Sequence, residues 1–462
     1  MVVAALRQAT ETLRDTADAT PSGRERHVDL VRAVAILAVV VGHWLVAAVT
    51  EAEDGAVDGV NALEVVGWAH PLTWAFQVMP LFFFIGGYAN AASLTANRRD
   101  GGDAVAWVAS RFERILVPAA AMLVTLALVV VVARLVGVDA DAAGSAVWLA
   151  SIPLWFLAAY LAVVGLAPLT EWASRRFGHL LVPCALVVSV VVVDVLHLGV
   201  GWDEVGQLNH LLVWVAFHQL GYAWREGVLP PTVRVGALVA GLGLSAAVLA
   251  VVVGPYPTSM VDVAGDDIQN VTPPTLALLA LGIGQIGVVL AVRDSTADWL
   301  RRPHVWRVVV GVNAVVLTVF LWHMTAAVVA AAALHLTGLV PTAAVDSAAW
   351  LAWRPVWLAG CAVALAVLVA AACGIELSMP GARRGAQVPS ILGRLLVGAG
   401  CVGALGGMIA IAVAEEGVHG PAGLPTLALV AVLAGTASLL VARHEREREP
   451  AGDPGGSRGS SS

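Results

Sequence analysis

Apolar stretches long enough to cross a bilayer recur along the chain, separated by short polar connections. The hydrocarbon core of a membrane is about 30 Å thick and needs about 20 apolar residues in a helix. The pattern predicts an all-α, polytopic transmembrane helix bundle of twelve spans. These lie near residues 30–49, 72–92, 115–134, 147–167, 180–199, 208–224, 234–254, 273–292, 308–336, 348–373, 391–414 and 424–442.

The connections between these spans alternate in charge. Arginines precede the first span and gather in every second connection, whereas aspartate and glutamate dominate the others. Cytoplasmic loops of membrane proteins carry an excess of arginine and lysine. With this orientation, all but two of the 26 basic residues lie on the cytoplasmic side, and the exceptions are Arg134 and Arg354. The charge pattern therefore predicts that both termini are cytoplasmic.

Composition agrees with a membrane protein and narrows its chemistry. The chain is 59% hydrophobic and 13% charged, against about 25% charged residues in typical soluble domains. Every basic residue is arginine, which with the Ala, Val and Gly bias is typical of a GC-rich bacterial genome. The four cysteines lie in apolar runs without metal-ligand spacing, so we expect no metal site and no disulfide framework. Nothing in the chain predicts a nucleic-acid partner.

The first span carries three titratable side chains, Asp29, Arg32 and His43. Such groups are expensive inside a membrane and are therefore candidate functional residues. Arg32 and His43 are eleven positions apart, which places them about 20° apart around a helix and about 16 Å apart along it. Asp29 shares this face as an i,i+3 partner of Arg32. Imidazole suits a general base that acts on a hydroxyl, although His43 could instead pack by bonding a backbone carbonyl.

Two further sets of polar residues are candidates. Arg111 and Arg114, at i and i+3 where the third span begins, form a guanidinium pair suited to phosphate groups, or alternatively only a topology signal. Within other spans lie Gln77, His218, Gln285, Asn313 and His323. Each could serve an interhelical hydrogen bond, but together they predict a polar substrate cavity. Asp194 and His197, by contrast, are interpreted as a solvated edge.

At several places the chain resembles acyltransferase family 3, a family of integral membrane proteins. The resemblance is carried by Arg32 and, after ten intervening residues, His43, by the block MPLFFFIGGY, by Arg111-Phe-Glu-Arg114, and by the segments PLWFLAAYL and FLWHMT. It covers about residues 24–373. Relatives have about ten core spans, and many carry a fused hydrolase-like domain that this chain lacks.

Together, the composition of the chain and the resemblance predict four parts. Residues 1–25 form a cytoplasmic N-terminal segment with a short surface helix, and residues 26–375 form the acyltransferase-like membrane domain. Residues 376–445 form two additional spans without an assigned role, and residues 446–462 form a disordered Gly/Ser/Pro-rich tail.

The resemblance also implies a function, which is O-acyl transfer in the cell membrane of a bacterium. The donor is expected to be acyl-CoA, above all acetyl-CoA, with its phosphates held by Arg111 and Arg114. His43 would act as the general base, while Arg32 and Asp29 position the donor or fix the span. The acceptor would be a hydroxyl of a cell-envelope glycan, a glycolipid or a small-molecule secondary metabolite. The oligomeric state is left open.

Two other classes of function remain open from the sequence. Twelve spans with intramembrane titratable groups also fit a proton-coupled secondary transporter of a small solute. A non-catalytic membrane partner would tolerate the loss of His43. Motifs typical of nucleotide hydrolysis and of zinc proteases (GxxxxGK[ST] and HExxH) do not occur in the chain, and the serine-hydrolase pattern GxSxG does not occur in the apolar spans or their connections.

Overall fold

The computed structural model describes residues 14–15, 17–21, 23–51, 57–340, 343–379, 385–414 and 420–448. Most of the expected N-terminal surface helix and most of the expected disordered tail lie outside these residues. The elements in chain order are α2 (Arg26–Val46), β1 (Ala47–Glu51), β2 (Val57–Asn61), η1 (Ala62–Glu64), η2 (Gly67–Leu72), α3 (Thr73–Phe76), α4 (Met79–Arg99), α5 (Ala104–Leu135), α6 (Ala140–Ser151), α7 (Leu154–Phe177), α8 (Leu181–Val200), α9 (Asp203–Gly206), α10 (Asn209–Arg225), α11 (Val233–Val253), α12 (Leu276–Leu300), α13 (Pro303–Ala314), α14 (Val316–Leu336), α15 (Ala348–Ser378), α16 (Ile391–Ala412) and α17 (Thr426–Arg448).

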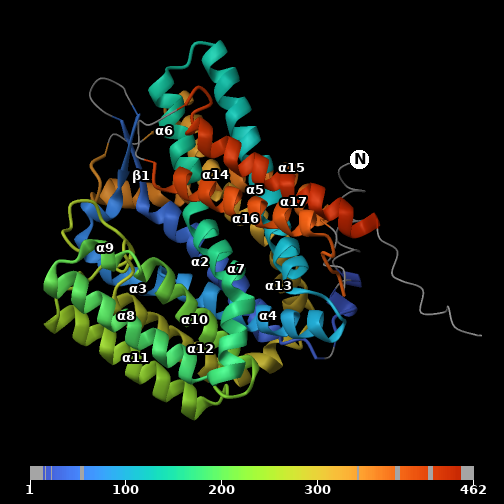
Figure 1. Cartoon of the computed structure of the whole chain (residues 1–462). Coiled ribbons are helices and arrows are strands. Elements are labelled where there is room, and N and C mark those ends of the chain that lie inside the picture. The colour runs from blue at the N-terminus through green and yellow to red at the C-terminus, as the bar shows by residue number, and fades with distance from the viewer. Residues whose placement is uncertain are drawn as a thin grey trace, which may run out of the picture.

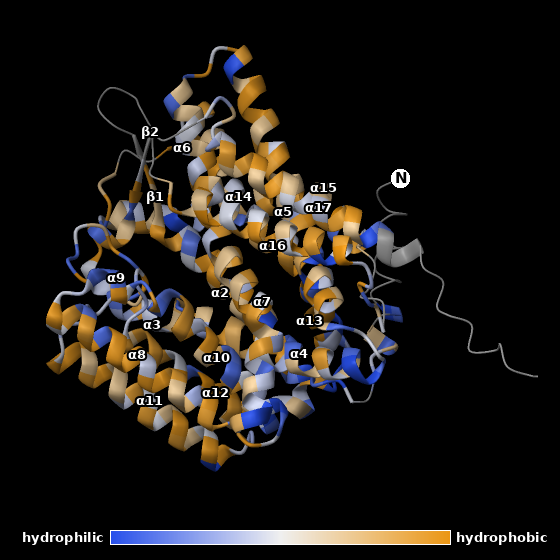
Figure 2. Cartoon of the chain, in the orientation of Figure 1, coloured by the Kyte–Doolittle hydropathy of each residue, from blue (hydrophilic) through white to orange (hydrophobic). Residues whose placement is uncertain are grey.

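The long helices form one bundle around α2 (Figure 1). Among the described residues, eleven helical segments are long and apolar enough to cross a membrane. The twelfth predicted span corresponds to α10, whose 17 residues would reach only about 26 Å along the helix axis. Hydrophobic residues cover the outer faces of α8 and α11 (Figure 2). The predicted all-α bundle of about twelve spans is confirmed, and the cytoplasmic location of the termini stays a prediction.

The predicted single span at 308–336 is divided into two helices, and a carboxylate explains the break. Glu376 of α15 accepts hydrogen bonds from the backbone N–H groups of Leu317 (3.2 Å) and Thr318 (2.8 Å), and from the Thr318 hydroxyl. The first N–H groups of a helix have no partner within the helix, and an anion there is stabilising. Glu376 therefore supports the start of α14 inside the bundle.

Two glycines allow α4 and α10 to pack backbone against backbone. A Cβ added at Gly87 would lie 1.9 Å from the carbonyl oxygen of His218, and one added at Gly221 would lie 2.0 Å from that of Phe84. No real Cβ makes such contacts, so both positions require glycine. Gly87 belongs to the block MPLFFFIGGY, so part of this block serves the close approach of the two helices.

The interpretation of Asp194 as part of a solvated edge is wrong. Its side chain lies in α8 and is buried, where it accepts a hydrogen bond from the Tyr256 hydroxyl and another from the backbone N–H of Leu276 (3.1 Å). The connection between α11 and α12 folds back over this end of α8. A loop that returns from two spans later leaves no local sign in the sequence around Asp194.

The two C-terminal helices α16 and α17 form a hairpin that packs against α5 and α7. Close approach within the hairpin depends on small residues, because a Cβ at Gly407 would lie 2.6 Å from the carbonyl oxygen of Ala428. Of the tail expected at 446–462, residues 446–448 continue α17.

Candidate functional site

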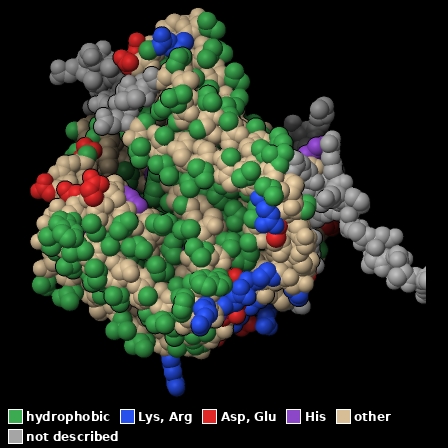
Figure 3. Space-filling model, viewed as in Figure 1, with side chains coloured by type: hydrophobic (Ala, Val, Ile, Leu, Met, Phe, Trp, Pro, Cys, Tyr) green, Lys and Arg blue, Asp and Glu red, His purple; other side chains and the backbone are tan. Residues whose placement is uncertain are grey.

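A chamber of about 1200 Å³ opens at one end of the bundle. Most of its lining residues are apolar or aromatic, and they come from α2, β2, η1, η2, α3, α4, α6, α7, α10, α15 and α16 and from the connections at this end. The surface is hollowed beside a histidine side chain, between β1 and α6 above and α9 below (Figure 3). We call this the chamber end of the protein. The chamber is larger than the roughly 300–1000 Å³ typical of small-molecule pockets.

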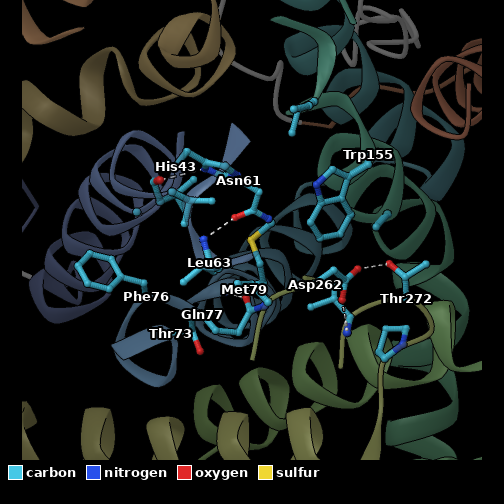
Figure 4. A pocket seen from close by; sticks show the side chains of 18 of the residues that line it. His43, Asn61, Leu63, Thr73, Phe76, Gln77, Met79, Trp155, Asp262 and Thr272 are labelled. Atoms are coloured by element: carbon cyan, nitrogen blue, oxygen red, sulfur yellow. Dashed lines mark hydrogen bonds between the residues drawn. The ribbon is translucent and has the colours of Figure 1, made fainter. Parts of the chain in front are cut away.

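His43, in the last turn of α2, lines this chamber. Its ring lies on one wall, across from Trp155 and Asp262 (Figure 4). The sequence places this imidazole at the end of a spanning helix, and the chain turns away into β1 only four residues later. His43 is therefore both inside the helix bundle and within reach of a molecule in the chamber.

A second histidine, His323 of α14, holds the His43 ring from behind. His323 is fully buried, and its Nε2 lies 3.3 Å from Nδ1 of His43. Nδ1 of His323 lies 2.5 Å from the carbonyl oxygen of Phe320, and Nδ1 of His43 lies 2.9 Å from that of Val39. Carbonyl oxygens only accept, so each Nδ1 carries the proton of a neutral ring. The unprotonated Nε2 of His43 is then the nitrogen available to a substrate.

Arg354 of α15 fixes the end of α2 that carries His43. Its guanidinium donates to the carbonyl oxygens of Trp44 (2.5 Å), Leu45 (2.8 Å) and Ala47 (2.9 Å). It also lies 4.7 Å from the ring centre of Trp350. The last carbonyl groups of a helix have no partner within the helix, and a cation there is stabilising. Arg354 is not among the site residues predicted from the sequence, although an arginine on the side of the membrane opposite to most others was a signal.

Polar groups on the chamber walls come from several elements. Gln77 lines the chamber and donates to the carbonyl oxygen of Met260 (2.8 Å), which joins α3 to the connection before α12. Asp262 accepts from the Thr272 hydroxyl (2.6 Å) and from the Val271 N–H (3.0 Å). Burial raises the pKa of the Asp262 carboxyl above its usual range.

Asp29 and Arg32 lie at the opposite end of α2, which we call the arginine end. Asp29 is buried, and it accepts from Arg24 through both oxygens (2.6 and 2.9 Å) and lies 3.4 Å from Arg32. Asn313, predicted to line a substrate cavity, donates to the backbone carbonyl of Asp29 (2.9 Å) and lies 3.5 Å from Arg32. The predicted Asp29–Arg32 pair is therefore part of a larger polar cluster.

A second pocket, of about 480 Å³, adjoins this cluster. Its wall includes four arginines, Arg24, Arg26, Arg293 and Arg301. Arg24 joins the pocket to Asp29, and Arg293 is paired with Glu25 at 2.7 Å. The pocket therefore combines guanidinium groups with carboxylates that hold them in place.

The two arginines of the RFER motif are not equivalent. Arg111 is half-buried, bonds the Ser93 hydroxyl and lies 5.3 Å from the ring centre of Trp107. Its Nε is buried without a hydrogen-bond partner among the described residues. Arg114 is exposed, and Arg111 is close enough to Arg32 and Arg114 to interact with both charges. Three guanidinium groups therefore gather in one region, with Arg111 the innermost of the motif.

The remaining cavity candidates lie away from the chamber surface. Gln285 donates to the carbonyl oxygens of Trp74 and Gln77, both at 2.9 Å, and so supports the wall from behind. His218 is fully buried, and its Nε2 lies 3.1 Å from Asn90 between α10 and α4. Of the five predicted cavity residues, Gln77 lines the chamber. Gln285 and His323 support residues that line it.

The arrangement places the His43 imidazole at one end of α2 and a cluster of arginines at the other end. A neutral imidazole with a fixed tautomer can take a proton from a hydroxyl held in the chamber. Guanidinium groups suit phosphate oxygens. The bundle can therefore hold an anionic molecule at the arginine end and an alcohol at the chamber end.

Comparisons with known proteins identify the family. No curated protein and no solved structure gives a significant match to the chain. A family model described as an acyltransferase domain, Acyl_transf_3, matches residues 26–374. The match begins with α2 and ends within α15, so it includes both ends of the site and leaves α16 and α17 outside. The chain therefore belongs to acyltransferase family 3 and is a multi-pass membrane acyltransferase.

Proposed function

We propose that the protein transfers an acetyl group from acetyl-CoA to a hydroxyl of an acceptor bound in the chamber. The observation that carries this proposal is the geometry of His43. In a chain of an acyltransferase family, this imidazole lines a large chamber, and its Nδ1 is held by Val39 and His323. The acceptor belongs to one of the classes expected from the sequence, a cell-envelope glycan, a glycolipid or a secondary metabolite.

The proposed reaction uses Nε2 of His43 as the general base. Nε2 takes the proton of the acceptor hydroxyl while the hydroxyl oxygen forms a bond to the thioester carbonyl carbon. The carbon–sulfur bond then breaks, and the thiolate of CoA receives the proton from His43. The products are the ester and free CoA, so His43 returns to its neutral form without a further reactant.

The donor is proposed to enter from the arginine end. Its phosphates would meet Arg111, whose Nε has no hydrogen-bond partner among the described residues, and the other guanidinium groups nearby. The pantetheine arm is long and thin, and it would extend beside α2 toward His43, about 16 Å from Arg32 along the helix. The charge pattern of the connections supports a cytoplasmic arginine end, and the proposed location is a bacterial cell membrane.

The test is an assay of purified protein reconstituted in lipid nanodiscs with membrane extract as the source of acceptor. Acetyl-CoA labelled in its acetyl group is added, and both free thiol and labelled product are measured. We expect equal amounts of the two. His43→Gln should lose both, by about 10²- to 10⁴-fold. His335→Gln is the matched control, since His335 is exposed in the last turn of the same helix as His323.

Two results would contradict the proposal. One is near wild-type turnover in a well-folded His43→Gln protein, which would reduce His43 to a packing residue. The other is solute uptake driven by a proton gradient in proteoliposomes without any release of CoA, which would favour the secondary transporter.

A further inference from the structure

The hairpin of α16 and α17 forms part of the chamber that contains His43. Ile409 and Ala412 at the end of α16, and Val413 directly after it, are lining residues of the chamber. The family model ends at residue 374. One wall of the site is therefore supplied by a part of the chain that lies outside the family domain.

Specific contacts fix this wall to the bundle. The indole nitrogen of Trp148, itself a lining residue in α6, donates to the carbonyl oxygen of Ala414 (3.0 Å). On the other side of the hairpin, Gly423 packs so closely that an added Cβ would lie 3.1 Å from Val130 of α5 and 3.4 Å from Val147 of α6. The end of α16 is therefore held in a set position beside α6.

The side chains that this wall presents are apolar and uncovered. Ile409 is 46% exposed and Val413 is 72% exposed among the described residues. Trp148 and Trp155 continue the apolar surface onto α6 and α7. Burying such a surface against an apolar group is favourable, whereas a strongly hydrated molecule would lose water without new hydrogen bonds there.

We propose that the C-terminal hairpin is an acceptor-recognition element for an amphipathic alcohol. Ile409 and Val413, with the α6–α7 wall, bind the apolar part of this acceptor. Its polar part lies along Asn61 and Gln77, on the side of the chamber that holds His43. The role of His43 toward the hydroxyl rests on the proposed function, whereas the binding of the apolar part does not. The hairpin thereby selects a lipid-like acceptor over a free glycan.

The experiment uses the full-length protein in nanodiscs with a photoreactive probe, a hexadecanol that carries a diazirine in its chain. After irradiation, labelled peptides are identified by mass spectrometry. We expect label on the α6–α7 peptide that contains Trp148 and Trp155, in addition to lipid-facing positions such as Leu249 of α11. Octyl glucoside should compete for the chamber peptide, whereas methyl glucoside, with the same sugar and no chain, should not.

The matched variants are Val413→Trp and Val402→Trp. Both valines are on α16 or directly after it and are 72% and 73% exposed, but Val402 is not a lining residue of the chamber. Filling the chamber should lower labelling of the α6–α7 peptide about tenfold, since even one methylene of misfit in an apolar pocket costs about that factor. Val402→Trp should leave it unchanged, and Leu249 should be labelled equally in both.

Three results would overturn the inference: label confined to lipid-facing peptides, equal labelling in both tryptophan variants, or equal competition by methyl glucoside. His43→Gln separates this inference from the proposed function. If His43→Gln protein is labelled normally, and no acetyl transfer occurs even in the wild type, the hairpin still binds an amphipathic alcohol and the transfer mechanism is wrong. If transfer occurs and the chamber is not labelled, the hairpin has no such role.

Discussion

The two ends of α2 differ in the charge and polarity of their surroundings. At the arginine end, Asp29 is held by Arg24 and Arg32, and four arginines surround a pocket of about 480 Å³. At the chamber end, an imidazole with a fixed tautomer lines a mostly apolar space of about 1200 Å³. One helix thus joins a basic region to an apolar one, as expected for an enzyme whose two substrates differ in polarity.

The largest effect that would sharpen this comparison concerns donor binding. Arg111→Ala should weaken acetyl-CoA binding by roughly 1.5–3 kcal/mol for each lost charge-assisted bond. Arg111→Lys should recover only part of the lost affinity for acetyl-CoA, because lysine lacks the planar guanidinium group that can bond two phosphate oxygens at once. The measurement is calorimetric titration of acetyl-CoA into reconstituted protein.

Two other variants serve as references for this titration. His43→Gln should bind acetyl-CoA as the wild type does, because His43 lies at the other end of α2. Arg114→Ala should have a smaller effect than Arg111→Ala, because Arg114 is exposed and solvent screens its charge. Unchanged affinity in the Arg111→Ala protein would leave the RFER motif as a topology signal.

Much of this arrangement could be predicted from the sequence, because it depends on local patterns. The length of the apolar runs was enough to predict the bundle, and an eleven-residue spacing was enough to place Arg32 and His43 at two ends of one helix face. The family followed from short motifs. These features need no knowledge of which helices are neighbours.

Other features could not be predicted, because they depend on contacts between distant segments. His323 was expected to line a cavity, but it lies 280 residues from His43 in the chain and behind its ring. The chamber takes residues from α2, from the connection before α12 and from α16, which no local pattern links. The unequal burial of Arg111 and Arg114 likewise depends on the neighbours of α5.

The two exceptions to the charge rule illustrate the same limit. Arg134 is exposed in the last turn of α5, where a cation is favourable next to the final carbonyl groups. Arg354 is buried and caps α2, a different helix. The sequence shows that both are unusual, but only their neighbours separate a surface cation from one that fixes the site.

This difference between the two arginines gives the second prediction. Arg354→Ala removes guanidinium donors from three carbonyl oxygens at the end of α2, of which only that of Trp44 also accepts from the Trp357 indole (2.7 Å). Leaving a buried acceptor unpaired costs about 1–3 kcal/mol. We expect a lower thermal midpoint and slower transfer, because the position of His43 depends on this end of the helix. Arg134→Ala should change neither. Equal midpoints for the two variants in a detergent thermal-shift experiment would refute the capping role.

The third prediction concerns His323. His323→Phe keeps a ring of similar size but removes the acceptor that faces Nδ1 of His43, so the orientation of the base is less well defined. A neutral hydrogen bond is worth about 0.5–1.5 kcal/mol, which corresponds to a loss of roughly twofold to tenfold in kcat with the KM for acetyl-CoA unchanged. His335→Phe, on the exposed end of the same helix, is the control. A rise in the KM for acetyl-CoA instead would place His323 on the donor path.

The smallest expected effect is the pH dependence that Asp262 brings to the chamber end. Burial raises the pKa of its carboxyl in the folded chain. A raised folded pKa means that the carboxyl favours folding while protonated, and that this contribution is lost as the pH rises through the folded pKa. The thermal midpoint of Asp262→Asn relative to the wild type should therefore increase from acid to neutral pH.

The control for this measurement is Asp266→Asn, because Asp266 is exposed in the same connection. Its midpoint should run parallel to that of the wild type across the pH range. If the midpoint of Asp262→Asn also runs parallel to that of the wild type, ionisation of the Asp262 carboxyl does not destabilise the folded protein. At the arginine end, partner guanidinium groups stabilise the buried carboxylate of Asp29, whereas Asp262 accepts from a hydroxyl and a backbone N–H. A pH response confined to Asp262 would show that the chamber end disfavours charge where the arginine end accommodates it.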